Sequence, residues 1–379
     1  MRKRFNPNVK FLSLTYDRNT PKGDQIRKTD EPRPTTTCYQ RLPSQQSIRL
    51  LCLRPGAENS PIETILSTYP LTNLPSYEAL SYCWGTRSGS SITCNSHSMT
   101  IQENLYHALR ALRRHDVERI LWVDAVCINQ SDIDERTSQV QLMRQIYQYS
   151  TRAVIWLGGH FQGSNEGVDL LLRIHKLALK DDNQINTPAQ ALTPDDLLKL
   201  GLPSMDSTGW GSLDAIFWRP WFTRVWIIQE LTVSKDALVI CGDRSIPWAD
   251  LAHAARFILQ HSLTAITQVD PRPATKLEKF RQAYLTCKGD QPLLPLLLEA
   301  RDAFATNDRD KVFALMGLSE RDTFSFVPDY SLSIEVVFIE FSKYHIEKTG
   351  TLDILSAVED HSYRLKKKLP SWVPDWEVH

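Results

Sequence analysis

Apolar residues in the first half of the chain follow two different periodicities. Short apolar runs lie at 47–56, 77–85, 119–129, 152–159 and 237–242. Such runs predict strands, and the nearly continuous runs 119–129 and 152–159 are typical of strands buried on both faces. Residues 102–114 and the stretch after Ser131 instead repeat apolar side chains at helical spacing. Strands that alternate with helices predict an α/β domain with a mostly parallel sheet flanked by helices.

Residues near the ends of these segments support the same elements. Asn95–Ser96 marks the turn of a predicted hairpin at 91–101. Ser131 and Asp134 resemble a capping box, with Asp in place of the usual Glu. The sequence therefore predicts that a helix begins directly after the strand at 119–129.

The alternation of predicted strands and helices is interrupted in two regions of the chain. Residues 160–217 contain helical stretches around a polar loop, and we interpret them as an insertion that covers a cleft. Later segments are mainly helical, including a long helix at 332–350 that ends at Gly350. The predicted organisation is a flexible, proline-dotted arm at 1–36, an α/β domain at 37–245 and a mainly helical extension at 246–379.

Composition narrows the functional classes. The 379 residues include 44 Lys plus Arg and 44 Asp plus Glu, so the global basic field expected of a nucleic-acid-binding protein is absent. Seven cysteines form no CxxC pair, and the histidines show no metal spacing, which favours reduced cytosolic thiols over disulfides or a metal site. No apolar run approaches the roughly 18 residues of a membrane span. We therefore expect a soluble, cytoplasmic protein without a signal peptide, a metal or a bound nucleic acid.

Three ordered motifs resemble the fungal heterokaryon incompatibility (HET) domain. They are "YEALSYCWG", "LWVDAVCINQSDIDERTSQVQLMRQIYQYSTRAVIWLG" and "RPWFTRVWIIQEL". Flanking matches, such as "IRLLCLRPG" and "LPSWVPDW", extend the resemblance over roughly 39–376. One departure is "NDRDKVFALMGL", where the family often has Asp-Pro before the Arg. HET proteins act in fungal non-self recognition and trigger cell death, so the resemblance implies a cell-death effector with an upstream recognition protein as partner.

The HET domain in turn resembles TIR domains, which implies a flavodoxin-like fold. Enzymatic TIR domains cleave NAD between nicotinamide and ribose with a helical glutamate that lies four residues after a tryptophan. Trp226 and Glu230 have this separation. The resemblance implies that Glu230 is catalytic and that NAD or a related nucleotide is the substrate, with no cofactor. It also implies that self-association completes the site.

The residues around Glu230 leave two roles open. Trp226 and Glu230 lie one helical turn apart and are expected to share a face. A carboxylate beside an indole is disfavoured in its charged form unless a cation or hydrogen bonds compensate. Such a carboxylate can stabilise the oxocarbenium-like transition state of N-glycosidic cleavage, or form a covalent sugar adduct. Alternatively, Glu230 forms a structural ion pair with Arg219 or Arg224.

Eight further residues are candidates for substrate binding. They are Ser81, Tyr82, Trp84, Gly85, Asp124, Asn129, Arg224 and Trp226. The first four end a predicted strand, and ligands in open α/β sheets bind beyond the carboxyl ends of strands. Tyr82 also suits the core, and Asp124 and Asn129 also suit a structural role in tying a loop. Arg224 either clamps a phosphate or neutralises Glu230. Arg136 meets a pyrophosphate, lies on a solvated helix face or forms an assembly contact.

Three functions fit these residues. The first is an NAD glycohydrolase that releases nicotinamide and ADP-ribose or a cyclic form. The second is a non-enzymatic signalling module that triggers cell death by homotypic association, with Glu230 structural. The third is a sensor that binds a nucleotide without turnover. Whether Glu230 lines an open cleft or is sealed by Arg224 separates the first two.

Overall fold

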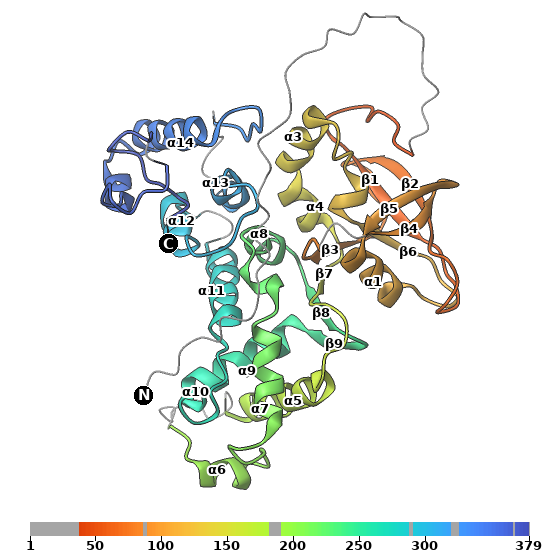
Figure 1. Cartoon of the computed structure of the whole chain (residues 1–379), viewed down its shortest axis with the longest axis vertical. Coiled ribbons are helices and arrows are strands. Elements are labelled where there is room, and N and C mark those ends of the chain that lie inside the picture. The colour runs from red at the N-terminus through yellow and green to blue at the C-terminus, as the bar shows by residue number, and fades with distance from the viewer. Residues whose placement is uncertain are drawn as a thin grey trace, which may run out of the picture. The chain divides into compact units, whose positions relative to one another are not determined.

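A single sheet of nine strands organises the part of the chain that the computed structural model describes (Figure 1). The described residues are 38–85, 89–181, 191–287, 291–319, 326–366 and 368–378. In sheet order the strands are β5 (His97–Gln102), β4 (Gly89–Cys94), β2 (Glu63–Pro70), β1 (Ser47–Leu53), β6 (Arg119–Trp122), β3 (Glu78–Tyr82), β7 (Ala153–Trp156), β8 (Ala237–Cys241) and β9 (Arg244–Pro247). The predicted arm at 1–36 lies outside the described residues.

The α/β class is confirmed, but the prediction of a mostly parallel sheet is only partly right. β6, β3, β7 and β8 run parallel in the centre, where β7 is fully buried. β1 runs antiparallel to both of its neighbours, β2 and β6. β5 and β9 also pair antiparallel with their neighbours. The sheet is therefore mixed. Short connections make the consecutive strands β1–β2, β4–β5 and β8–β9 antiparallel, whereas β1 and β6 pair antiparallel although they are far apart in the sequence.

Helices and two short 3₁₀ turns connect and flank the strands. They are α1 (Glu103–Leu112), α2 (Asp124–Cys127), α3 (Ile133–Gln141), α4 (Met143–Tyr149), α5 (Ser164–Asp181), α6 (Pro194–Lys199), α7 (Thr208–Phe217), η1 (Pro220–Thr223), α8 (Trp226–Thr232), α9 (Trp248–Gln260), α10 (Leu263–Thr267), α11 (Arg272–Thr286), α12 (Leu293–Glu299), α13 (Asp310–Met316), α14 (Ile334–Thr349) and η2 (Asp353–Ala357). The predicted insertion supplies α5, α6 and α7, and α5 packs against α7 and α9.

Two local predictions need correction. The strand predicted at 119–129 ends at Trp122, because the chain turns at Asp124 into the short helix α2. The Asp124 carboxylate accepts a 2.7 Å hydrogen bond from the backbone N–H of Ala125, which favours this turn. The helix start expected at Ser131 lies later, at α3, where Asp132 is the N-cap and accepts a 3.0 Å bond from the N–H of Glu135.

Other turn and cap predictions are confirmed. Asn95 and Ser96 both have positive φ, 50° and 65°, and join β4 to β5 as a hairpin. Gly350 ends α14 with φ 65°, in the left-handed conformation that glycine adopts at little cost.

Helices on both sides of the predicted boundary at residue 245 pack together. α8 contacts α11 and α13 as well as α4, and residues 37–379 group as one compact unit. The division into a domain at 37–245 and an extension at 246–379 stays a prediction. The packing nevertheless places C-terminal helices directly against the segment that carries Glu230.

Candidate functional site

Glu230 lies on α8 with its side chain enclosed, and its residue is only 4% exposed. The hydroxyl of Ser81, near the carboxyl end of β3, donates a hydrogen bond to the Glu230 carboxylate. The indole N–H of Trp221 donates to the same hydroxyl oxygen at 2.8 Å. A chain of two hydrogen bonds therefore fixes the carboxyl group between the sheet and η1.

Arg224 supplies the positive charge of this cluster. Its guanidinium donates a 2.5 Å hydrogen bond to the backbone carbonyl of Tyr82. Burial alone would lower the pKa of Arg224, but the nearby Glu230, Cys83 and Asp124 raise it above its ordinary value. Arg224 is therefore charged, and it offsets negative charge on the two carboxyl groups.

Asp124 follows β6 and is the second carboxyl group of the cluster. The indole N–H of Trp84 donates to its Oδ2 atom at 2.8 Å, and Trp84 itself is 44% exposed. Burial raises the pKa of Asp124, whereas the charge of Arg224 and the bonds from Trp84 and Ala125 act in the opposite direction. The carboxyl ends of β3 and β6 thus bring together a solvent-facing indole and a half-buried acid.

The electrostatic balance favours protonation of Glu230. Burial raises its pKa, and the negative charge of Asp124 adds to that rise. Arg224 and hydrogen bonds from Ser81 and Tyr147 oppose it without cancelling it. A carboxyl group poised in this way can exchange a proton or stabilise a developing cation.

Trp226 has a different partner from the one its spacing suggested. Its indole interacts with the carboxyl group of Asp310 at the start of α13, which is 9% exposed. The hydroxyl of Tyr330 donates to Asp310 at 2.6 Å, and the guanidinium carbon of Arg136 lies 5.0 Å from the centre of the Tyr330 ring. The C-terminal region therefore contributes directly to the surroundings of α8.

The remaining candidate residues make contacts within the chain. The Gly85 N–H donates to Oε1 of Gln102 at 2.9 Å. The Asn129 N–H donates to Oε1 of Glu135 at 2.7 Å, and the Asn129 side chain accepts from Ser131. Neither residue joins the cluster around Glu230.

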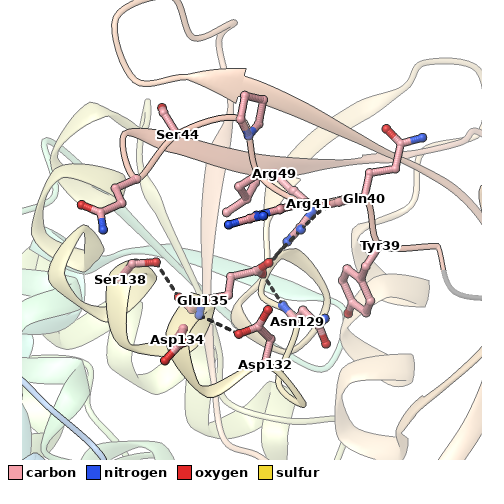
Figure 2. Close-up of a pocket in the computed structure, with 13 residues that line it drawn as sticks. Tyr39, Gln40, Arg41, Ser44, Arg49, Asn129, Asp132, Asp134, Glu135 and Ser138 are labelled. Carbon is pink, nitrogen blue, oxygen red and sulfur yellow. Dashed lines mark hydrogen bonds and ion pairs between the residues drawn. The ribbon is translucent and has the colours of Figure 1, made fainter. Parts of the chain in front are cut away.

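Asn129 instead lines a hollow of about 870 Å³ between the segment 39–45 and the start of α3. Figure 2 shows Glu135 beneath Arg49, which is 2% exposed and bonds both carboxylate oxygens. Arg49 also donates to the backbone carbonyl of Gln40 at 2.6 Å. The buried ion pair therefore ties the segment 39–45 to the sheet, which is a structural use of Glu135.

A second hollow, of about 700 Å³, is lined by Arg224 and Ile228 together with residues of α11. Glu230 lines neither of these two hollows. Arg224 is therefore the residue of the cluster that lines this groove, and its charge also acts on Glu230.

The motifs at the strand ends and on α8 are those that a family comparison recognises. The model of the heterokaryon incompatibility protein (HET) family matches residues 77–230. Over this segment the chain resembles HET-domain proteins. The match begins at the strand that carries Ser81 and ends at Glu230, so the matched segment contains Asp124, Arg224 and Glu230.

A curated relative extends the comparison beyond the HET domain. "Heterokaryon incompatibility protein 6, OR allele" from Neurospora crassa is 27% identical over 390 aligned residues. The alignment covers 87% of this chain and 57% of the relative, so the chain spans a little over half the length of that protein. No solved structure matches the chain.

The described residues contain neither a metal-binding cluster nor a membrane-spanning helix. No group of three or more His, Cys, Asp or Glu side chains in that part of the chain could hold a metal ion. None of the described helices is long and apolar enough to cross a membrane.

Proposed function

We propose that this protein triggers cell death in fungal heterokaryon incompatibility by hydrolysing NAD to nicotinamide and ADP-ribose. The relative that carries the name of an incompatibility protein supports the biological role. The observation that carries the chemistry is the enclosed Glu230, held by Ser81 and faced by Arg224 at the carboxyl ends of parallel strands. Ligands of open α/β sheets bind at such strand ends.

In the proposed reaction the bond between nicotinamide and C1′ of the ribose breaks, and its electron pair leaves with nicotinamide. The ionised Glu230 stabilises the oxocarbenium-like ribose that remains. Water then adds to C1′ and releases one proton, which gives ADP-ribose. Nicotinamide departs as a neutral base, so no general acid is required.

This chemistry needs Glu230 to be ionised and reachable. Because burial raises the pKa of Glu230, turnover should rise with pH through a value above 4.5, its ordinary pKa. Because Glu230 is 4% exposed, side chains around it have to move aside for substrate. We expect self-association to bring about this opening, as the likeness to TIR domains implies.

The test is NAD turnover by the purified chain over a range of protein concentrations, beside Glu230→Gln. Glu78→Gln is a matched control, because Glu78 is a half-buried carboxylate at the opposite end of β3 that pairs with Arg119 and Arg152. The proposal expects turnover by the parent and by Glu78→Gln, and loss in a folded Glu230→Gln. Equal turnover by Glu230→Gln would remove Glu230 from the mechanism.

A second candidate function is a non-enzymatic assembly module. The burial of Glu230 and the nearby charge of Arg224 favour it, since an enclosed carboxyl group with a nearby arginine is also a structural arrangement. Absence of turnover at every protein concentration, including forced crowding, would leave this candidate in place of the enzyme.

A further inference from the structure

The groove that Arg224 lines has the features of a ligand site, and only one of its two sides belongs to the HET match. It is lined by the segment 218–228, inside the match, and by the helix α11, outside it, and its volume is about 700 Å³. Small-molecule sites typically occupy about 300–1,000 Å³. Its floor is apolar, with Phe222 9% exposed and Phe280 2% exposed.

One wall of the groove is an exposed tryptophan that is held in place. Trp218 is 58% exposed. Its indole interacts with the carboxyl group of Asp214, which also accepts a 2.8 Å hydrogen bond from the backbone N–H of Asp270. An exposed but oriented indole is suited to stack with a planar aromatic ligand at small entropic cost.

The opposite wall is a stripe of cations on one face of α11. Arg272, Lys276 and Lys279 follow one another at spacings of four and three residues, so they share a helical face. Each pairs with an acid: Arg272 with Asp270, Lys276 with Asp302, and Lys279 with Glu299 at 2.7 Å.

The two lysine pairs are exposed to solvent, whereas Arg272 bonds both carboxylate oxygens of Asp270. Lys279 and Asp302 have side chains that are 70% and 68% exposed. Exposed ion pairs contribute little to stability, so a phosphate group can replace Asp302 and Glu299 as the partner of the two lysines. Arg224 adds a fourth cation at the end of the groove that faces the strand-end cluster.

We propose that this groove binds a nucleotide, with the base stacked on Trp218 and the phosphates on Lys276, Lys279 and Arg224. The inference rests on the proposed function and places its substrate. A phosphate at Arg224 competes with Glu230 and Asp124 for the guanidinium. Binding in the groove therefore loosens the cation whose charge acts on Glu230, which couples substrate binding to that carboxyl group.

Binding of ADP-ribose, measured by titration calorimetry in a Glu230→Gln background, tests the groove without turnover. Trp218→Ala should weaken binding by roughly tenfold, the loss of one stacked base. Lys279→Gln should weaken binding about threefold and Glu299→Gln should strengthen it by a similar factor, with both effects smaller at high salt. Tyr363→Ala, which removes another exposed aromatic ring that is 71% exposed, should change nothing.

The changes in ADP-ribose affinity should have opposite signs in Lys279→Gln and Glu299→Gln if the groove binds phosphate. A purely structural ion pair would give changes of the same sign, because loss of either partner would destabilise it. Inorganic phosphate as probe should respond to Lys279→Gln but not to Trp218→Ala. Effects of the same sign, unchanged affinity in Trp218→Ala, or no binding of ADP-ribose would overturn the proposal. So would loss of self-association in Trp218→Ala with ADP-ribose binding intact, which would make the groove a protein interface.

The groove and the proposed reaction fail in different ways. If Trp218→Ala and Lys279→Gln turn over NAD with the same KM as the parent, the nucleotide site in the groove is refuted and the proposed NAD hydrolysis still stands. Binding of ADP-ribose with the expected pattern, but without NAD turnover by the parent chain, supports the groove and removes the reaction.

Discussion

The structure makes a specific prediction for the stability of the variant Arg224→Gln. Arg224 is the cation that faces Glu230 and Asp124, whose pKa values burial has already raised from ordinary values of 4.5 and 3.8. Removing one partner of a buried charge pair typically costs about 3–5 kcal/mol. Because Arg224 is only partly enclosed, we expect a loss in the free energy of unfolding of about 2–3 kcal/mol at pH 7.5.

The pH dependence follows from the two acids. Without the guanidinium, the pKa values of Glu230 and Asp124 rise further, so the folded state holds protons that the unfolded state releases. Stability of the variant therefore falls as pH rises above the ordinary carboxyl range, and the deficit relative to the parent is smaller at pH 5 than at pH 7.5. The lost hydrogen bond to the Tyr82 carbonyl, about 1 kcal/mol, remains at both pH values.

Denaturant unfolding at pH 5 and pH 7.5 measures both effects, with Arg364→Gln as control. Arg364 is 3% exposed and donates to backbone carbonyls of residues 369, 370 and 371, so its loss should not depend on pH. The double variant Arg224→Gln/Glu230→Gln should recover at least about 1 kcal/mol at pH 7.5, because a glutamine at position 230 does not have to take up a proton when the protein folds. Equal deficits at both pH values, or no recovery in the double variant, would refute the electrostatic account.

Three further variants test the packing around the site. Gly317→Ala should destabilise the protein by about 1–3 kcal/mol, since a Cβ there would lie 2.1 Å from Oε1 of the buried Gln229, and a thermal melt that matches the parent would contradict this. Asp132→Ala should cost about 1 kcal/mol through loss of the α3 N-cap, while Asp132→Ser should retain most of the stability in the same urea titration. Tyr330→Phe should lower the free energy of unfolding by about 1–2 kcal/mol, because it removes one hydrogen bond to the buried Asp310. Any blue shift in aromatic fluorescence should be confined to residues near α8. An unchanged unfolding midpoint would show that this hydrogen bond does not stabilise the protein.

Much of the fold could be predicted because its rules are local. The apolar runs at 77–85 and 152–159 correspond to β3 and β7, and the left-handed Asn95–Ser96 turn follows from residue types that tolerate positive φ. The antiparallel pairing of β1 with β6 could not be predicted, since the two strands are far apart in the sequence and no local pattern links them. The strands β2 and β9 were not predicted at all.

In the candidate site, too, some features follow from local sequence and others depend on contacts between distant residues. Ser81 lies near the carboxyl end of β3, as the strand-end argument expects, and Asp124 follows the neighbouring strand β6. Glu230 and Arg224 reach this edge from α8 and the segment before it, which the strand-end argument does not cover. Trp226 does share α8 with Glu230, but its indole interacts with Asp310. No local periodicity links residues so far apart, and a pair of this kind becomes visible only in three dimensions.

The contact between Trp226 and Asp310 also sets an order of events during synthesis. A ribosome releases the chain from its N-terminus, so α8 emerges well before α13 and the segment that carries Tyr330. Until those residues appear, the indole lacks its carboxyl acceptor and α8 lacks one of the helices that pack on it. A chain that stopped between Glu230 and Asp310 would contain every residue of the HET match and still lack a finished site. Premature termination in that interval should therefore yield an inert product, which links completion of translation to the first moment at which the protein can act.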